Sequence, residues 1–97
     1  MATYILLLNW TQQGIENVKE SPKRLAAAKK AWGEMGAKVK AFYLAMGQYD
    51  MALLVEAPND ETIAKAVLSQ AAKGTIRTVT LRAFTEDEYR EIIAALP

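Results

Sequence analysis

The sequence contains neither cysteine nor histidine. Without cysteine the chain has no disulfide, no thiolate nucleophile and no thiolate metal ligand. Without histidine it has no imidazole general base and no imidazole ligand for a metal or a haem iron. The sequence therefore predicts no metal site and no cofactor, and it excludes the function classes that depend on these groups.

Long hydrophobic runs are also missing, because no apolar stretch approaches the length that crosses a bilayer. The apolar run at residues 4–8 has no basic segment before it and no small-residue cleavage pattern after it, which is not typical of a signal peptide. With no disulfides to suggest export, the expected location is cytoplasmic. The 97 residues, 52% of them apolar, are expected to form one domain over residues 1–97 with a modest core.

The net charge of +1 conceals an uneven distribution of charge along the chain. Residues 1–48 carry seven basic and three acidic side chains, whereas residues 49–97 carry five basic and eight acidic ones. No glycine-rich or aromatic nucleic-acid motif accompanies the basic half, so solvated helix charges explain it better than a nucleic-acid surface.

The centre of the chain is a predicted hairpin at Met46-Gly47-Gln48-Tyr49-Asp50, between the apolar runs 41–46 and 51–55. Gly47 can take a positive φ, and the Asp50 carboxylate is expected to hold turn amides near Gly47 or Gln48. On both sides of this turn, strand, helix and strand patterns follow in mirrored order.

Before the hairpin, residues 3–10 are apolar on both parities, which predicts a central strand. A helix is predicted from Ser21-Pro22 to the terminating Gly36, with Trp32 in its core stripe. The partial alternation of residues 38–46 favours an edge strand.

After the hairpin, residues 51–55 again predict a central strand, and residues 75–83 alternate as an edge strand does. Between them a helix is predicted from residues 58–60 to Lys73-Gly74, with the buried stripe Ile63, Ala64, Val67 and Ala71. A capping box from Thr85 to Glu88 starts a third helix, which is expected to bury Tyr89, Ile92, Ile93 and Leu96.

This order predicts an α+β, ferredoxin-like βαββαβ sandwich with an antiparallel sheet in the order 4-1-3-2 and an added C-terminal helix. The helices of such a fold cover one sheet face only, yet the central strands are apolar on both faces. A second chain is the expected cover. The result would be a homodimer or higher even oligomer of the dimeric α+β barrel type, with a cleft between sheet and helices or between subunits.

The motif Gly47-x-Tyr49-Asp50 resembles the signature of the GYD domain family. Four further motifs resemble that family's pattern in the same order: Thr11-x-x-Gly14, Ser21-Pro22-x-Arg24, Glu56-Ala57-Pro58-x-Asp60 and Arg82-Ala83-Phe84. The resemblance implies a ferredoxin-like fold related to dimeric α+β barrels, and it supplies no catalytic residues.

Three function classes stay open at this point, and fold analogy separates none of them. The favoured one is a homo-oligomeric module that binds or senses a small molecule in a cleft. The alternatives are a cofactor-independent enzyme of the monooxygenase, cyclase or decarboxylase type, and a purely structural or partner-binding oligomer.

The candidate ligand-binding residues are polar or aromatic side chains at strand ends and at the hairpin: Asn9, Trp10, Tyr43, Tyr49, Asp50 and Glu56. Gly47 and Asp50 are also predicted to have a structural role in the turn. An enzyme would add Arg77 and Arg82 as candidates, but a regular strand places these two on opposite faces, where they cannot form one anion site.

Overall fold

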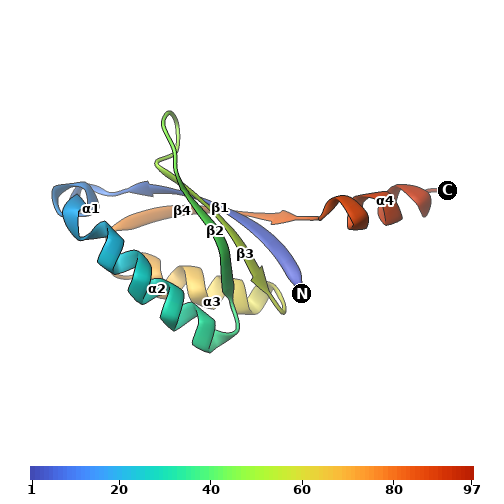
Figure 1. The fold of residues 1–97 in the computed structure, drawn as a ribbon, viewed down its shortest axis with the longest axis horizontal. Helices are drawn as coiled ribbons and strands as arrows, with labels where there is room; N and C mark the ends of the chain where they lie inside the picture. The colour runs from blue at the N-terminus through green and yellow to red at the C-terminus, as the bar shows by residue number, and fades with distance from the viewer.

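The computed structural model describes residues 1–97 and shows a four-stranded antiparallel sheet with helices α2 and α3 on one face (Figure 1). The elements are β1 (Ala2–Trp10), α1 (Gln12–Glu16), the 3-10 helix η1 (Val18–Glu20), α2 (Ser21–Met35), β2 (Lys38–Leu44), β3 (Met51–Ala57), α3 (Asp60–Ala71), β4 (Ile76–Ala83) and α4 (Glu86–Ala94). The strand order is β2-β3-β1-β4, which is the predicted order read from the other edge. The predicted ferredoxin-like α+β fold is confirmed.

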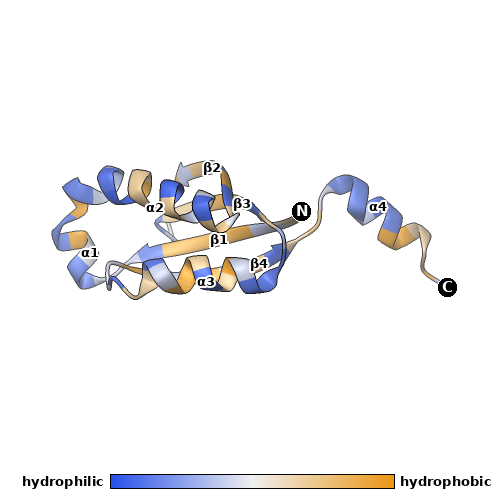
Figure 2. Cartoon of the chain, turned by 90° about the horizontal axis from the view of Figure 1, so that it is seen from below, coloured by the Kyte–Doolittle hydropathy of each residue, from blue (hydrophilic) through white to orange (hydrophobic).

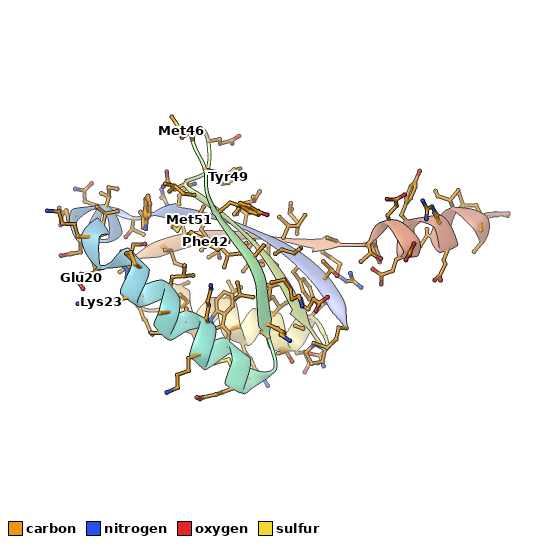
Figure 3. All side chains as sticks on the ribbon, in the orientation of Figure 1. Glu20, Lys23, Phe42, Met46, Tyr49 and Met51 are labelled. Atoms are coloured by element: carbon orange, nitrogen blue, oxygen red, sulfur yellow. The ribbon has the colours of Figure 1, made fainter.

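The loop between β2 and β3 is longer than predicted, because β2 ends at Leu44 and not at Met46. A hydrogen bond from the Ala45 N–H to the Asp50 carbonyl closes it at 2.8 Å. Gly47 has a φ of +118°, a conformation that other residues rarely adopt. The loop projects from the body and carries Met46 at its tip (Figure 3).

The core lies between the sheet and the two helices. Tyr4 and Leu6 of β1 stand opposite Val55 and Leu53 of β3, and all four side chains are buried. The core members from the helices are Ala28 and Trp32 of α2 and Ile63, Ala66 and Val67 of α3. Phe42 and Met51 point from the sheet toward α2 (Figure 3).

The predicted stripe of α3 needs a correction. Ala64 is exposed and Ala71 only half-buried, whereas Ala66 and Gln70 are buried. Starting from Ile63, the i, i+3, i+4 and i+7 positions are residues 63, 66, 67 and 70, which is the ordinary buried face of a helix. Because Gln70 is polar, the sequence does not indicate that this position belongs to the buried face of α3.

The second sheet face has no helix over it and is apolar. Ile5 of β1 stands between Leu54 of β3 and Leu81 of β4, and Val79 lies beside them on the same face. These four side chains are between 37% and 44% exposed. The prediction that both faces of the central strands are apolar is confirmed, and this surface is called the open face below.

Helix α4 begins at the predicted capping box. The Thr85 hydroxyl accepts a hydrogen bond from the Glu88 N–H at 3.2 Å, and the Glu88 carboxylate accepts one from the Thr85 N–H at 2.8 Å. The bond from the Thr85 backbone is the main cause that lowers the pKa of the Glu88 carboxyl.

The expected burial of the α4 stripe is wrong for this chain. Tyr89, Ile92, Ile93 and Leu96 are 45% to 61% exposed. The reason is geometric: residues after β4 continue outward, so α4 projects from the end of the sheet (Figures 1 and 2). The molecule is therefore elongated, 52 × 31 × 18 Å. No helix combines the length and the apolar character that a membrane span requires.

Replacing Gly14 by alanine tests the packing of α1 on the segment that leads into β4. A Cβ at Gly14 would lie 2.0 Å from the Thr75 carbonyl oxygen, whereas one at Gly33 on α2 would meet nothing within 4 Å. We expect Gly14→Ala to destabilise the fold by about 1–3 kcal/mol through overpacking. Gly33→Ala is the control and should stabilise by about 0.5–1 kcal/mol. Urea denaturation measures both, and equal stabilities would contradict this packing.

Candidate functional site

A cavity of about 50 Å³ lies between α2 and the sheet. Apolar side chains form most of its wall, among them Leu8, Phe42 and Met51 of the sheet and Leu25 of α2. The polar lining residues come from α2, from α3 and from the segment that leads into β4: Ser21, Arg24, Lys29, Gln70 and Thr75. An apolar pocket with a few convergent polar groups is the usual form of a small-molecule site.

Two buried polar atoms belong to residues that line this cavity. The indole Nε1 of Trp32 and the hydroxyl Oγ1 of Thr75 have no hydrogen-bond partner within the chain. Trp32 is 2% exposed and Thr75 is 7% exposed, so bulk water does not reach them freely. Buried polar groups in folded proteins are nearly always hydrogen-bonded, so these two atoms require an explanation.

A group of hydrogen bonds stabilises the segments at one end of the cavity. The Thr11 hydroxyl donates to the Gly74 carbonyl at 2.6 Å and accepts from the Gly14 N–H at 3.1 Å. The Thr11 N–H donates to the Thr75 carbonyl at 3.1 Å. The Arg24 guanidinium donates to the Asn17 and Gly14 carbonyls at 3.0 and 3.3 Å. These bonds connect the end of β1, helix α1, helix α2 and the start of β4.

Asp50 ties the hairpin to the end of β1. Its carboxylate accepts a hydrogen bond from the Trp10 N–H at 3.0 Å, and its own N–H lies 3.1 Å from the Asn9 side-chain oxygen and 2.9 Å from the Leu8 carbonyl. The expectation that Asp50 holds amides near Gly47 or Gln48 is thereby corrected. The loop carries those amides outward, while the last residues of β1 run alongside Asp50.

The sequence-predicted site residues do not form one cluster. Asn9, Trp10 and Asp50 lie together, and Trp10 lines the cavity. Tyr43 belongs to the open face and is 65% exposed. Tyr49 is half-buried in the hairpin loop and does not line the cavity.

Glu56 lies on the open face, apart from the cavity. It pairs in the sheet with Thr3 and Lys38, and its carboxylate is 3.9 Å from the Lys40 ammonium. Both side chains of this ion pair are partly exposed, so solvent screens it and its contribution is small.

Arg77 and Arg82 stand opposite Asn9 and Tyr4 on β1 and so point to different faces of the sheet, as their spacing predicts. The Arg82 guanidinium lies 4.5 Å from the ring centre of Phe84 and 5.6 Å from that of Tyr4. This is a cation–π arrangement that joins the end of β4 to β1.

Beneath Arg82, a shallow groove of about 460 Å³ between α3 and β4 contains the pair Tyr4 and Asp60. The Tyr4 hydroxyl donates to the Asp60 carboxylate at 2.5 Å. Burial, and then this hydrogen bond, raise the pKa of Tyr4 above its usual value, while Arg82 opposes the rise. Tyr4 therefore stays neutral, and its hydrogen bond to Asp60 has the structural role of linking β1 to α3.

The family comparison matches residues 4–93 to the GYD domain model. The chain belongs to the GYD domain family. A relative from Thermus thermophilus is 34% identical over 84 residues, which are 86% of this chain and 88% of the relative. That protein is named "Glutamine synthetase and cystathionine beta-lyase binding protein".

Solved structures similar to this GYD domain have the same fold. The crystal structure of FFRP-DM1 has a TM-score of 0.60 at 22% identity and covers 87% of this chain and 100% of its own. The crystal structure of TTHA0845 from Thermus thermophilus has a TM-score of 0.55 at 26% identity, with 88% and 95% covered.

Residues of the motifs that resemble the GYD family form hydrogen bonds that connect separate elements of this chain. Thr11, Gly14 and Arg24 hold the cavity end, Asp50 holds Trp10, and Asp60 holds Tyr4. Sequence reasoning missed the cavity residues Gln70 and Thr75 and assigned Trp32 to the core alone. The one available signal was the polar Gln70 at a buried position of the α3 stripe.

Replacing Asp50 by alanine removes the acceptor for the Trp10 N–H. We expect Asp50→Ala to lower the free energy of unfolding by about 1–2 kcal/mol, since a partly buried donor loses its partner. Asp87→Ala on exposed α4, where the carboxylate only pairs with Arg90, should change it by less than about 1 kcal/mol. Urea denaturation followed by tryptophan fluorescence compares the two. If both variants match the parent, Asp50 has no structural role.

Proposed function

We propose that this GYD domain is a homodimeric protein-binding module, in which the open face pairs with a second copy and helix α4 binds a partner protein. The observation that carries this proposal is the projecting α4 with its exposed apolar stripe (Figure 2). A relative at 34% identity that is named as a binding protein for two enzymes supports it.

The composition of α4 suits binding in a groove. Its apolar residues Tyr89, Ile92 and Ile93 occupy positions i, i+3 and i+4, and Leu96 follows just beyond the end of the helix at Ala94. An amphipathic helix with this spacing can lay its apolar stripe into a hydrophobic groove of another protein. Arg90 forms ion pairs with Glu86 and Asp87, so the helix also carries a charged surface beside its apolar residues.

The proposed partner is an enzyme of the kind named for the relative, a glutamine synthetase or a cystathionine beta-lyase of the same organism as this chain. Full burial of an isoleucine, leucine or similar side chain contributes about 1.5–3 kcal/mol. Burial of the apolar side chains of α4 alone can therefore supply a substantial part of the binding free energy.

Replacing both isoleucines of the stripe by glutamine tests the role of α4. Glutamine keeps helix propensity but removes apolar surface. We expect the Ile92→Gln, Ile93→Gln variant to bind the immobilised partner enzyme at least about tenfold more weakly, because two central anchors are lost. Glu91→Gln, in the same helical turn, is the matched control and should bind like the parent. Biolayer interferometry measures all three proteins.

Two outcomes would contradict this part of the proposal. Parent-like binding by the Ile92→Gln, Ile93→Gln variant would exclude α4 as the docking element. Failure of the parent to bind glutamine synthetase and cystathionine beta-lyase would overturn the proposed partner class.

A second copy is the proposed cover of the open face. In a two-fold dimer the same patch of both copies forms the interface. The apolar residues around Ile5, Leu54 and Leu81 would therefore contact the same apolar residues of the second copy. Glu56, on the same face, pairs in the sheet with Lys38 and lies 3.9 Å from the Lys40 ammonium, so its negative charge is offset within each copy. Packed sheets lie about 10 Å apart, close enough for these side chains to interdigitate.

Replacing Leu81 by glutamate tests the dimer. We expect the parent to sediment as a dimer at micromolar concentration and Leu81→Glu to sediment as a monomer, since dimerisation would bury an unpaired charge. Leu68→Glu, on the exposed side of α3, should stay dimeric. The α4 variant should also stay dimeric if the helix serves the partner enzyme. A monomeric parent in analytical ultracentrifugation would contradict the dimer.

Small-molecule binding is the second candidate function, and the cavity under α2 supports it through its apolar wall and its few polar lining residues. The predicted ligand residues contribute only Trp10 to its lining. The cofactor-independent enzyme and the cytoplasmic location stay predictions.

A further inference from the structure

We infer that the outer edge of β4 binds an extended, acidic segment of a partner protein, which pairs with β4 as an additional strand and places alternate side chains in the groove between β4 and α3. This surface adds to the proposed protein-binding function. It depends neither on α4 nor on the dimer of the open face.

The outer edge of β4 has free main-chain hydrogen-bonding groups. β4 is the last strand of the sheet and pairs only with β1. None of the backbone hydrogen bonds outside the helices and the sheet involves residues 76–82. Alternate residues of an edge strand direct their N–H and C=O groups away from the sheet, so this edge is a template for another strand.

The two edges of the sheet differ in how they are protected against such pairing. β2 has a register shift between Val39 and Ala41, and it carries Lys38 and Lys40. Bulges and lysines are common means by which proteins block an edge. β4 keeps a regular register from residue 76 to residue 83 and contains neither lysine nor proline. The unprotected edge is therefore that of β4.

The groove between α3 and β4 gives an added strand a place for its side chains. Helix α3 lies beside β4 (Figure 2), and the groove is lined by Thr80 of β4 and by Ala64 and Leu68 of α3. Leu68 is 68% exposed, and residues 79–82 are exposed on both faces of β4, so α3 leaves the outer part of β4 uncovered. A new strand lies about 4.8 Å from its neighbour and points alternate side chains to each face, so its helix-side residues would enter this groove.

The charge of β4 favours an acidic segment over a second copy of the chain. Arg77 and Arg82 are the charged residues of β4, and neither forms an ion pair within the chain. Arg82 shares its groove with Asp60, whereas Arg77 stands across from the neutral Asn9. Opposite charges across a strand pair stabilise it and like charges destabilise it. An acidic residue opposite Arg77 is therefore favourable, while a second β4 would bring only further arginines.

A short peptide is the probe for this edge. It is labelled with fluorescein, has blocked ends and has the sequence Thr-Ile-Val-Leu-Val-Thr-Glu. In an antiparallel pair its isoleucine and leucine stand opposite Arg82 and Thr80, on the groove side, and its glutamate stands opposite Arg77. We expect fluorescence anisotropy on the full chain to show saturable binding with a Kd below about 100 µM.

Methylation of the peptide amides separates strand pairing from other kinds of binding. Successive N–H groups of a strand point to opposite sides, so only one alternate set faces β4. One peptide is methylated at the amides of the isoleucine, the leucine and the second threonine, and another at those of the two valines and the glutamate. One of these should bind at least about tenfold more weakly, because its hydrogen bonds to β4 are lost, and the other should bind like the unmodified peptide.

Arg77→Gln tests the charge at the edge. On the parent protein, replacing the peptide's glutamate by glutamine should weaken binding about twofold to fivefold, which is the range of a cross-strand charge pair. On Arg77→Gln the two peptides should bind equally, since the positive partner is gone.

Leu68→Gln tests the groove. We expect this variant to bind the peptide at least about threefold more weakly, because part of the apolar wall is lost. Ala72→Gln, at the end of the same helix and outside the groove, is the matched control and should bind like the parent. Both positions are exposed, so the urea midpoints of both variants should stay close to that of the parent.

The outcomes that overturn the inference are distinct. Absence of peptide binding excludes the edge as a docking surface, and equal effects of the two methylated peptides exclude strand pairing. If the parent forms tetramers at high concentration and Leu68→Gln stays dimeric, the occupant is a second copy and not a partner segment. None of these results bears on α4, and the Ile92→Gln, Ile93→Gln variant should bind the peptide like the parent.

Discussion

Two helices cover only one face of a sheet whose central strands are apolar on both faces, and the rest of the structure depends on this constraint. Helices α2 and α3 bury Tyr4, Leu6 and Val55, which are the largest fully buried side chains of the core. Ile5 and Leu54, on the opposite face, are left partly in solvent. Removal of apolar surface from water is the main favourable term in folding and association, so the uncovered face gives the chain a reason to associate.

Around this core, the residues that resemble the GYD family hold elements together. Thr11 joins the end of β1 to the segment before β4, Asp50 joins the hairpin to β1, and Asp60 joins α3 to β1. Each tie spans at least 40 positions in the sequence and satisfies a polar group that would otherwise be partly buried without a partner. Of the motif residues, Ser21 and Arg24 line the cavity, and its other polar lining residues are Lys29, Gln70 and Thr75.

The candidate site could be predicted from the sequence only in part. Trp10 was a predicted ligand residue and does line the cavity, and Trp32 was correctly predicted to be buried. Helical periodicity shows that Trp32 faces the core, but it does not show whether the indole N–H finds a partner there. Thr75 and Gln70 meet Trp32 only because α2, α3 and the start of β4 pack together, and no local pattern records that meeting.

The sequence by itself determined the order of the four strands and of helices α2, α3 and α4, the central and edge strands, the positive φ at Gly47 and the capping box of α4. These features follow from local chemistry and from the parity of side chains along a strand, which a short stretch of residues contains. The tertiary structure alone decided which sheet face receives the helices, that Asp50 holds Trp10, and that α4 points away from its own core. Alternation separates two faces without saying which is covered, and the direction of a terminal helix depends on surfaces contributed by distant parts of the chain.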